Sequence, residues 1–138
     1  MSIVAAVITR LDAVTAVTAL VSTRIYNGTF PQDGTFPAIR VQRIGEDEQM
    51  HLRGAVGTIR TRIQIDSVAD SAEPIGDAQS IDSAVHGDGS GSGLIGWAGN
   101  VGDIDIQAVI PAGVRETYDG EELRQYRVMR DAFVWWNG

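Results

Sequence analysis

A glycine-rich stretch, HGDGSGSGLIGWAGNVGD at residues 86–103, is the part of the sequence that most resembles a site of chemistry. Within it, residues 91–96 match the G-x-G-x-x-G pattern of dinucleotide-binding proteins. In that pattern a strand precedes the glycines and a helix follows them, so that the helix N-terminus faces a pyrophosphate. Here the segment follows a predicted helix and leads into a predicted strand. We therefore expect a flexible loop over residues 87–103, and binding of a small ligand such as a nucleotide remains the alternative that calorimetric titration tests.

The other residues of chemical interest lack the spacing of a catalytic or metal site. His51 and His86 are the only histidines, and neither lies in an H-E-x-x-H or G-x-S-x-G motif. Asp103 and Asp105 place two carboxylates on one strand face, but Ca²⁺ requires six or more oxygens and no spaced series of ligands surrounds them. The chain has no cysteine, and all eleven basic residues are arginine, which removes thiolate and lysine chemistry. The sequence therefore predicts no enzyme activity, no cofactor and no metal.

Length and composition indicate one globular domain, which we place at residues 1–138, with 43% hydrophobic and 21% charged residues. The formal net charge of −7 disfavours sequence-independent binding of nucleic acid, because duplex phosphates are also negative. The apolar N-terminal segment, residues 1–21, is interrupted by Arg10 and Asp12, and no basic residue precedes its apolar run. It therefore fails as a membrane-spanning helix and as a signal peptide, and we expect a protein made and used in a cytosol.

Hydrophobic periodicity predicts the elements that must position these residues. Apolar residues at spacings of three and four predict a helix over residues 2–21, or two helices with a break near Asp12, whose carboxylate suits the start of the second. Alternation with a period of two predicts strands at 38–44 and 57–66. The segment between them, about residues 45–57, is expected to form the over-long tip of a hairpin.

A further helix is predicted after the hairpin. Asp70, Ser71 and Glu73 are of the types that start a helix in a capping box. An apolar stripe then begins at Ile75, and the helix is expected to end near Gly87.

Two more strands complete the predicted fold. Residues 104–110 alternate cleanly, with Ile104, Ile106, Ala108 and Ile110 on one face, and a long strand is expected at 123–136. The predicted fold class is α+β, a small and largely antiparallel sheet of about four strands with two or three helices packed on one face.

Arginines follow the outward faces of the predicted strands, on the hairpin and again along the last strand at positions 124, 127 and 130. Such a face either keeps the protein soluble or binds another subunit, because the planar guanidinium group suits carboxylates and interfaces. Trp135 and Trp136 are adjacent, so they point to opposite faces of a strand and only one can join the same core. The candidate interface residues, with the acidic tip, are Arg40, Glu46, Asp47, Glu48, Met50, His51, Leu52, Arg53, Arg60, Arg62, Arg127, Arg130, Trp135 and Trp136.

The order of these segments resembles one family. TRIYNG, a proline-containing loop and FPAIRVQRIG are followed by TIRTRIQIDSVADSAEPIGDAQSIDSAVHG and by a closing YRVMRDAFVWW. This arrangement is similar to that of the tail completion (tail terminator) proteins of tailed bacteriophages, which also occur in prophages and gene transfer agents. The resemblance extends over most of the chain and depends on order and spacing. It departs from the family at 87–103, where the family usually has a shorter connection.

The resemblance implies a structural role in a virion. It implies an α+β fold, a hexameric ring on the head-proximal end of the tail tube, an end to tube polymerisation, and a docking surface for the head connector. The implied partners are further copies of the chain, the tail tube protein and a head-side connector or stopper protein. It implies neither enzyme activity nor a cofactor, and it implies assembly in the host cytoplasm.

Three hypotheses remain open at this stage. The tip at 45–57 is expected to reach a neighbouring subunit, the tube or the connector. DNA is expected to pass through the ring without specific binding, because an acidic lumen repels phosphates. The alternative to a terminator is another neck or tail tube component.

Overall fold

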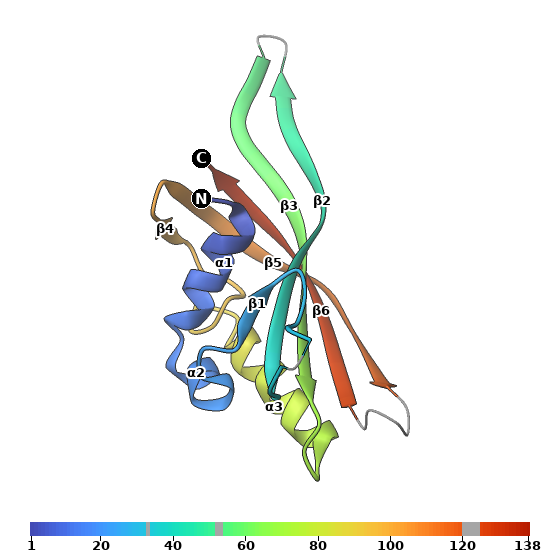
Figure 1. Cartoon of the computed structure of the whole chain (residues 1–138). Coiled ribbons are helices and arrows are strands. Elements are labelled where there is room, and N and C mark those ends of the chain that lie inside the picture. Colours follow the sequence, from blue (N-terminus) through green and yellow to red (C-terminus); the bar gives the residue numbers. More distant parts are fainter. Residues whose placement is uncertain (33, 52–53, 120–124) are drawn as a thin grey trace.

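A twisted sheet of six strands lies against three helices in the computed structural model, which describes residues 1–32, 34–51, 54–119 and 125–138 (Figure 1). The strand order is β1-β2-β3-β6-β5-β4, and every neighbouring pair is antiparallel except β1 with β2. The α+β class is confirmed, but the described sheet has six strands rather than about four. In chain order the elements are α1 (Ile3–Asp12), α2 (Thr15–Val21), β1 (Ile25–Asn27), β2 (Ala38–His51), β3 (Gly54–Ala69), α3 (Pro74–His86), β4 (Gly99–Val101), β5 (Ile104–Asp119) and β6 (Gln125–Asn137).

The N-terminal segment forms two helices, as one of the two sequence predictions had it. Ser2 caps α1, because its hydroxyl oxygen accepts a hydrogen bond from the N–H of Ala5 at 3.1 Å. The prediction that Asp12 starts the second helix is wrong, because Val14 precedes α2 and no side chain caps it. Among the described residues, no single helix is long and apolar enough to cross a membrane. Helices α1 and α2 together reach that length and composition, but they are bent by 88° where they join.

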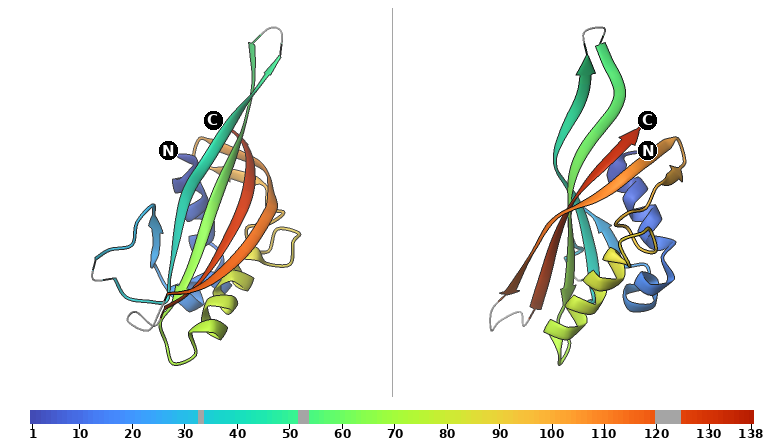
Figure 2. Two further views of the ribbon diagram at one scale, coloured as in Figure 1. Left: turned by 90° about the vertical axis from the view of Figure 1, so that its right-hand side faces the viewer. Right: turned by 180° about the vertical axis from the view of Figure 1, so that it is seen from behind.

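All three helices lie on one side of the sheet, and the opposite side is left without helices (Figure 2). The apolar face of the long strands is buried under the helices, as the alternation in the sequence predicted. The centre of this core includes Ile39, Val41, Ile63, Ile65 and Val134, all of which are fully buried. The sheet therefore has one face buried under the helices and one face that these helices leave uncovered (Figure 2).

The sequence predicted a long hairpin tip over residues 45–57. The structure corrects this, because most of these residues belong to strands β2 and β3. β2 continues to His51 and β3 begins at Gly54, so the two strands project well beyond the rest of the molecule (Figure 1). A bulge between Arg43 and Gly45 interrupts the ladder, which then resumes. The run of carboxylates resembled a loop in the sequence, but Asp47 stands opposite Arg60 across the ladder.

Helix α3 begins at Pro74 and ends at His86, close to the predicted bounds, but its start differs from the predicted capping box. Glu73 precedes the helix without a side-chain hydrogen bond, and the hydroxyl of Ser71 instead contacts the carboxylate of Asp77. Ile75 is 50% exposed and is therefore not part of the core stripe.

Strand β5 is longer than predicted and changes face along its length. It runs from Ile104 to Asp119, with register shifts after Ile106 and after Pro111. A β-bulge adds a residue to one strand and exchanges the two faces beyond it. As a result Val109 is buried, whereas Ile110, predicted to lie on the core face, is 47% exposed.

The glycine-rich segment is a loop over residues 87–98, as predicted, but it is packed against the core. Leu94 and Ile95 are buried in the main core cluster. The guanidinium group of Arg10 donates to the carbonyls of Gly91 and Gly93, at 2.9 and 3.0 Å. It also lies 4.7 Å from the ring centre of Trp97, and partial burial lowers the pKa of Arg10 from its ordinary value. Residues 99–101 of this segment form strand β4.

Two glycines in different surroundings test whether this packing is required. Gly96 has a φ of +81°, and a Cβ there would lie 2.2 Å from the carbonyl oxygen of Gly89, whereas a Cβ at Gly76 in α3 meets nothing within 4 Å. We expect Gly96→Ala to lower the free energy of unfolding by more than about 1 kcal/mol. Gly76→Ala should raise it by about 0.5–1 kcal/mol, because alanine favours the helix. Urea denaturation measures both, and equal stability of the two variants would contradict the packed loop.

Candidate assembly surface

The side of the sheet that faces away from the helices is the most distinctive surface of the described residues. Its side chains come from alternate positions of β2, β3 and β6, where Arg60 stands beside Trp135, Arg62 beside Phe133 and Asp66 beside Met129. We call this surface the open face and define it by Arg40, Asp47, Arg60, Arg62, Gln64, Asp66, Arg127, Met129, Asp131, Phe133 and Trp135.

The arginines of the open face are paired with carboxylates of the same face. Asp66 is fully buried and contacts Arg40, while Arg127 lies 3.7 Å from the same carboxylate. Arg62 donates to Asp131 at 2.7 Å. Arg60 pairs with Asp47 in the same way near the base of the hairpin. The open face is therefore close to neutral rather than a stripe of positive charge.

Aromatic rings lie beneath these guanidinium groups. Arg60 is 4.8 Å from the ring centre of Phe133 and 5.7 Å from that of Trp135, and Arg62 is 5.5 Å from Phe133. Arginine stacked on an aromatic ring is a common cation–π arrangement, and arginine, phenylalanine and tryptophan are enriched in protein interfaces. At the β2 side of the open face, Arg40 lies 5.6 Å from the ring centre of Phe30. The open face thus combines neutral charge with flat, half-buried aromatic groups.

The two adjacent tryptophans separate as expected. Trp135 lies on the open face, and Trp136 packs against the core on the helix side. The indole N–H of Trp136 donates to Thr61 at 2.9 Å, and Thr61 in turn donates to Glu46 at 2.8 Å. This chain of hydrogen bonds ties the base of the hairpin to the last strand.

The remaining predicted interface residues lie in several places. Arg130 is on the helix side, where its guanidinium group donates twice to the carboxylate of Asp82 in α3, at 2.8 Å each. Arg40, Arg60, Arg62, Arg127 and Trp135 are brought together on the open face, and Glu46 lies on the other side of β2. Glu48, Met50 and His51 belong to the outer part of β2, whereas Leu52, Arg53 and Arg124 lie outside the described residues.

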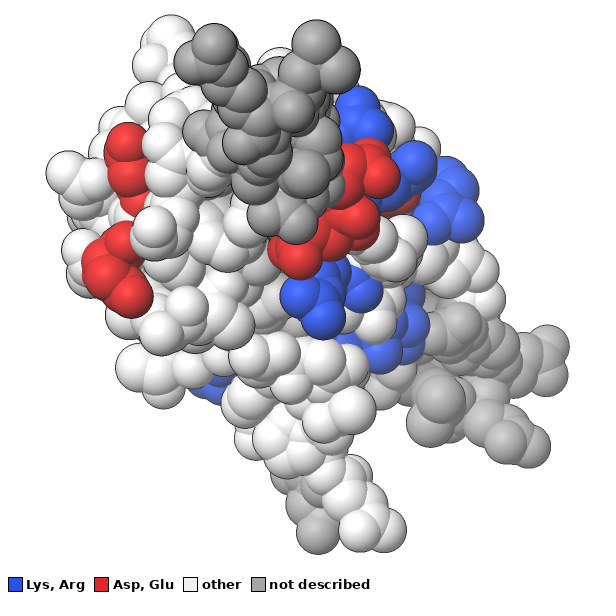
Figure 3. All heavy atoms as spheres, turned by 90° about the horizontal axis from the view of Figure 1, so that it is seen from above, with Lys and Arg blue, Asp and Glu red and all other residues white. Residues whose placement is uncertain are grey.

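The view along the hairpin shows how these charges are distributed (Figure 3). Acidic and basic side chains touch one another on one half of this view, whereas the charged groups on the other half lie apart from one another. The acidic residues of the hairpin base and the arginines of the sheet are thus mixed on one side of the protein. The sequence suggested instead an arginine face and a separate acidic tip.

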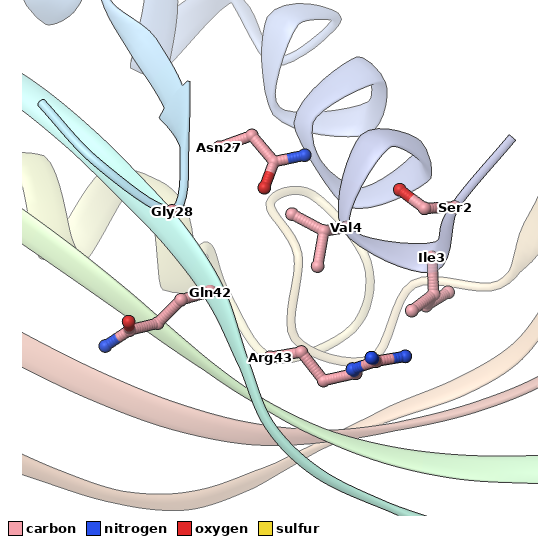
Figure 4. Close-up of a pocket in the computed structure, with 7 residues that line it drawn as sticks. All are labelled: Ser2, Ile3, Val4, Asn27, Gly28, Gln42 and Arg43. Carbon is pink, nitrogen blue, oxygen red and sulfur yellow. The ribbon is translucent and has the colours of Figure 1, made fainter. Parts of the chain in front are cut away.

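A groove of about 270 Å³ lies where the first turn of α1, the end of β1 and the middle of β2 meet. Val4 and Asn27 face the groove, Arg43 extends along it, and Gln42 points to the other side of β2 (Figure 4). Its lining combines one cation with small polar and apolar groups and contains no nucleophile paired with a base. The groove lies at the place where β1 ends and β2 loses its outer neighbour among the described strands.

In the described residues, the motifs considered for chemistry in the sequence do not form a catalytic, nucleotide-binding or metal site. The glycine pattern at 91–96 joins α3 to β4, so no helix follows it, and its carbonyls receive Arg10. The N–H and hydroxyl of Ser90 donate to the carboxylate of Asp88 at 2.9 and 2.8 Å, which holds the pKa of Asp88 well below its ordinary value. His86 makes a local contact with the carbonyl of Gly87 at 2.8 Å. Within the described part of the chain, no group of three or more metal-ligating side chains occurs.

Two features of this surface were not predicted from the sequence. Asp66 and Asp131 are the carboxylate partners of the arginines on the open face. The sequence could have indicated Asp66, because alternation places it on the same strand face as Arg62 and Gln64. The outer part of β5, beyond Ile110, was missed because its alternation is interrupted by Pro111 and Gly113. Both features depend on the pairing of strands that are distant in the sequence.

The buried carboxylate at the centre of the open face should be required for stability. We expect Asp66→Asn to lower the free energy of unfolding by about 3 kcal/mol, because two arginines lose a buried anionic partner. Asp47→Asn is the matched control on the same face, since Asp47 is 61% exposed in its side chain, and we expect a change below about 1 kcal/mol. Urea denaturation followed by tryptophan fluorescence compares the two, and equal losses would show that Asp66 is not the anchor.

Known proteins resemble the chain in both sequence and fold. Residues 5–91, more than half of the chain, match the sequence model of a family described as tail completion protein gp17. No curated protein matches the chain. A chain from a solved structure described as "Virion of native gene transfer agent (GTA) particle" superposes with a TM-score of 0.67, covering 97% of this chain and 93% of that chain, at 19% sequence identity. At that identity the superposition shows a shared fold.

Proposed function

The chain belongs to the family of tail completion proteins, and on that premise we propose that it forms a hexameric ring at the head-proximal end of a phage tail tube. It is a structural protein of a phage-type tail, a role that requires no catalysis. In the proposal the ring ends polymerisation of the tube and joins the tail to the head-side connector or stopper. The protein is then assembled in the host cytoplasm and resides in the neck of the virion.

The open face is the observation that carries this proposal. A sheet face of stacked arginine and aromatic side chains, left without helices, has the composition of a protein interface. A ring closed by rotation needs two different surfaces on each subunit, because its contacts are heterologous. The two sides of this sheet end in different strands, with β2 toward one edge and β5 toward the other, so each subunit has unlike surfaces to offer its neighbours.

The projecting hairpin supplies a second contact in the proposal. β2 and β3 extend beyond the body of the subunit, so their outer ends reach past the subunit's own core (Figure 1). We place residues 45–57 against a neighbouring subunit, the tail tube protein or the connector. Backbone pairing within the hairpin holds this extension in a fixed direction up to its last described residues.

Shortening the hairpin tests this contact. Replacing residues 49–58 by Asn-Gly keeps the pair formed by Glu48 and Ile59 and closes it with a two-residue turn. We expect the variant to fold with an unchanged melting temperature, within a few degrees, but to lose tube capping or head joining. Electron microscopy of particles assembled with the variant measures tail length and the fraction of tails joined to heads.

Ile75→Lys serves as the control, because Ile75 is exposed on α3 and lies outside the hairpin. It should give tails of normal length that are joined to heads. Normal tails and normal joining with the shortened hairpin would refute the assigned contact. Filaments formed by the purified, unaltered protein would instead indicate a tail tube component, since a terminator stops after one ring.

The net charge bears on the passage of DNA. We propose that DNA passes through the ring without specific binding, because a chain with a formal charge of −7 repels phosphates overall. Arg40, Arg60 and Arg62 each have a carboxylate partner, so they add little unneutralised positive charge to the surface of the subunit.

A further inference from the structure

Two strands of the sheet lack a backbone neighbour on one side, as far as the described residues show. On the outer side of β2, the hydrogen bonds from β1 and from Gly28 end at Val41. On the outer side of β5, β4 pairs as far as Ile106 and Gly96 donates to the carbonyl of Val109. Residues 42–51 of β2 and residues 110–119 of β5 are therefore free edges at opposite sides of one sheet.

The free edge of β5 is unusually exposed for a strand with apolar side chains. Ile110, Val114 and Tyr118 are 47%, 49% and 49% exposed. Helix α3 packs mainly against β3 and β6, so this part of β5 is exposed on both of its faces. Soluble proteins usually protect such an edge, because its free N–H and C=O groups pair readily with another strand. A second strand on this edge would satisfy the backbone and cover the apolar side chains together.

We propose that the free edge of β5 in one copy pairs antiparallel with the free edge of β2 in the next copy, so that one sheet continues around the ring. This inference rests on the proposed ring and identifies the surface by which its subunits join. The two edges are complementary in direction, since three antiparallel pairings separate β2 from β5 and make them run in opposite directions. They are also equal in length, ten residues or about 33 Å each.

Pairing the two edges along their full length fixes which residues meet. Asp119 of one copy then stands beside Gln42 of the next, and Tyr118 stands beside Arg43 at the groove of Figure 4. Because β2 has one extra residue between Arg43 and Gly45, the ladder continues with Arg115 opposite Asp47 on the open face. Opposite charges directly across a ladder are stabilising.

One pair in this register has like charges, Glu116 opposite Glu46. Glu46 is already hydrogen-bonded by Thr61, and Arg43 lies 3.7 Å from its carboxylate. Glu116 accepts a hydrogen bond from Gln79 at 3.0 Å. The cation of Arg43 therefore lies beside the two carboxylates and reduces their repulsion.

The register also fits the geometry of a closed wall of strands. Within one copy, the strand pairings place Gln42 opposite Gln64, Gln64 opposite Asp131, and Asp131 opposite Gly113. Gln42 and Gly113 therefore lie at the same height across the sheet. Pairing Gln42 of the next copy with Asp119 instead shifts that copy by six residues along the strand direction. That shift is about 20 Å along strands, and four strands are about 19 Å wide. The strands are then inclined by about 45° to the ring axis, at the upper end of the 35–45° typical of barrels. β1 and β4 lie beyond the two ends of the joint, so neither has to move.

Cysteine cross-linking tests the joint directly, because the chain has no cysteine of its own. Arg115→Cys combined with Asp47→Cys, and Tyr118→Cys combined with Arg43→Cys, should each form disulfides under mild oxidation. Within one copy these edges are three strand spacings apart, about 14 Å, which exceeds the roughly 7 Å between Cα atoms that a disulfide allows. Every disulfide formed must therefore join two copies.

Arg115→Cys combined with Glu46→Cys is the matched control, because Glu46 and Arg115 lie on opposite faces of the continuous sheet. We expect a ladder of cross-linked oligomers on denaturing gels for the two test pairs and less than about one tenth as much for the control. Equal cross-linking in all three variants would indicate random collision and overturn the proposed register.

A charged substitution on the edge gives an independent readout. Val114→Lys should abolish rings, since an edge lysine opposes further strand pairing, whereas Ile75→Lys at similar exposure should leave them unchanged. Circular dichroism checks that both variants fold. If Val114→Lys does not fold, Ile110→Lys on the same edge replaces it. Rings are counted by electron microscopy in the presence of tail tubes.

The outcomes separate this inference from the function on which it rests. Rings that persist with Val114→Lys, and that show no disulfides in either test pair, overturn the edge pairing but leave the proposed ring intact. An unaltered chain that forms no ring in the presence of tail tubes overturns the proposed function, and the edge pairing with it.

Discussion

The antiparallel pairing of β3 with β6 through the middle of the sheet is the constraint on which the rest of the structure depends. An unbroken ladder from Ile59–Trp136 to Ala69–Tyr126 fixes the register of the two strands. It places Ile63 beside Ala132 under the helices and Arg62 beside Phe133 on the open face. A slip of one residue would exchange the two sets, placing guanidinium groups in the core and isoleucines in solvent. The core and the open face are therefore two results of a single register.

The local spacing of polar and apolar residues was sufficient to predict those helices and strands that bury one side. The helical N-terminal segment, helix α3 and the alternating faces of β2, β3 and β6 follow from spacing alone, because one side of each is buried. The failures share a cause, which is contact between distant parts of the chain. Glycine content suggested a loop at 87–103 that is costly to order, but Arg10, some eighty residues earlier, holds its carbonyls in place. Bulges within β5 and β2 ended the apparent alternation before the strands themselves ended.

The candidate surface was predictable in position but not in character. Alternation placed Arg40, Arg60 and Arg62 on the face away from the core, and the composition suggested a positive stripe that would seek acidic partners elsewhere. The structure shows carboxylates within the same face, and Asp66 among them is fully buried. Burial of an acid beneath arginines follows only from the pairing of β2, β3 and β6, which a single sequence does not display. A neutral aromatic face favours packing against protein over attraction to phosphate.

A ring subunit that joins through strand edges must also avoid joining in the wrong register. Uninterrupted edges would allow one strand to slide along another two residues at a time and still match faces. In this chain both free edges contain irregularities that remove such freedom, since β2 has a bulge at Arg43–Gly45 and β5 has one at Pro111–Gly113. Pro111 in addition lacks an N–H, which excludes pairings that need a donor there. The short strands β1 and β4 cover the rest of each edge, so the sheet leaves only ten residues open on either side. In the proposed ring, these features limit each edge to one register of pairing.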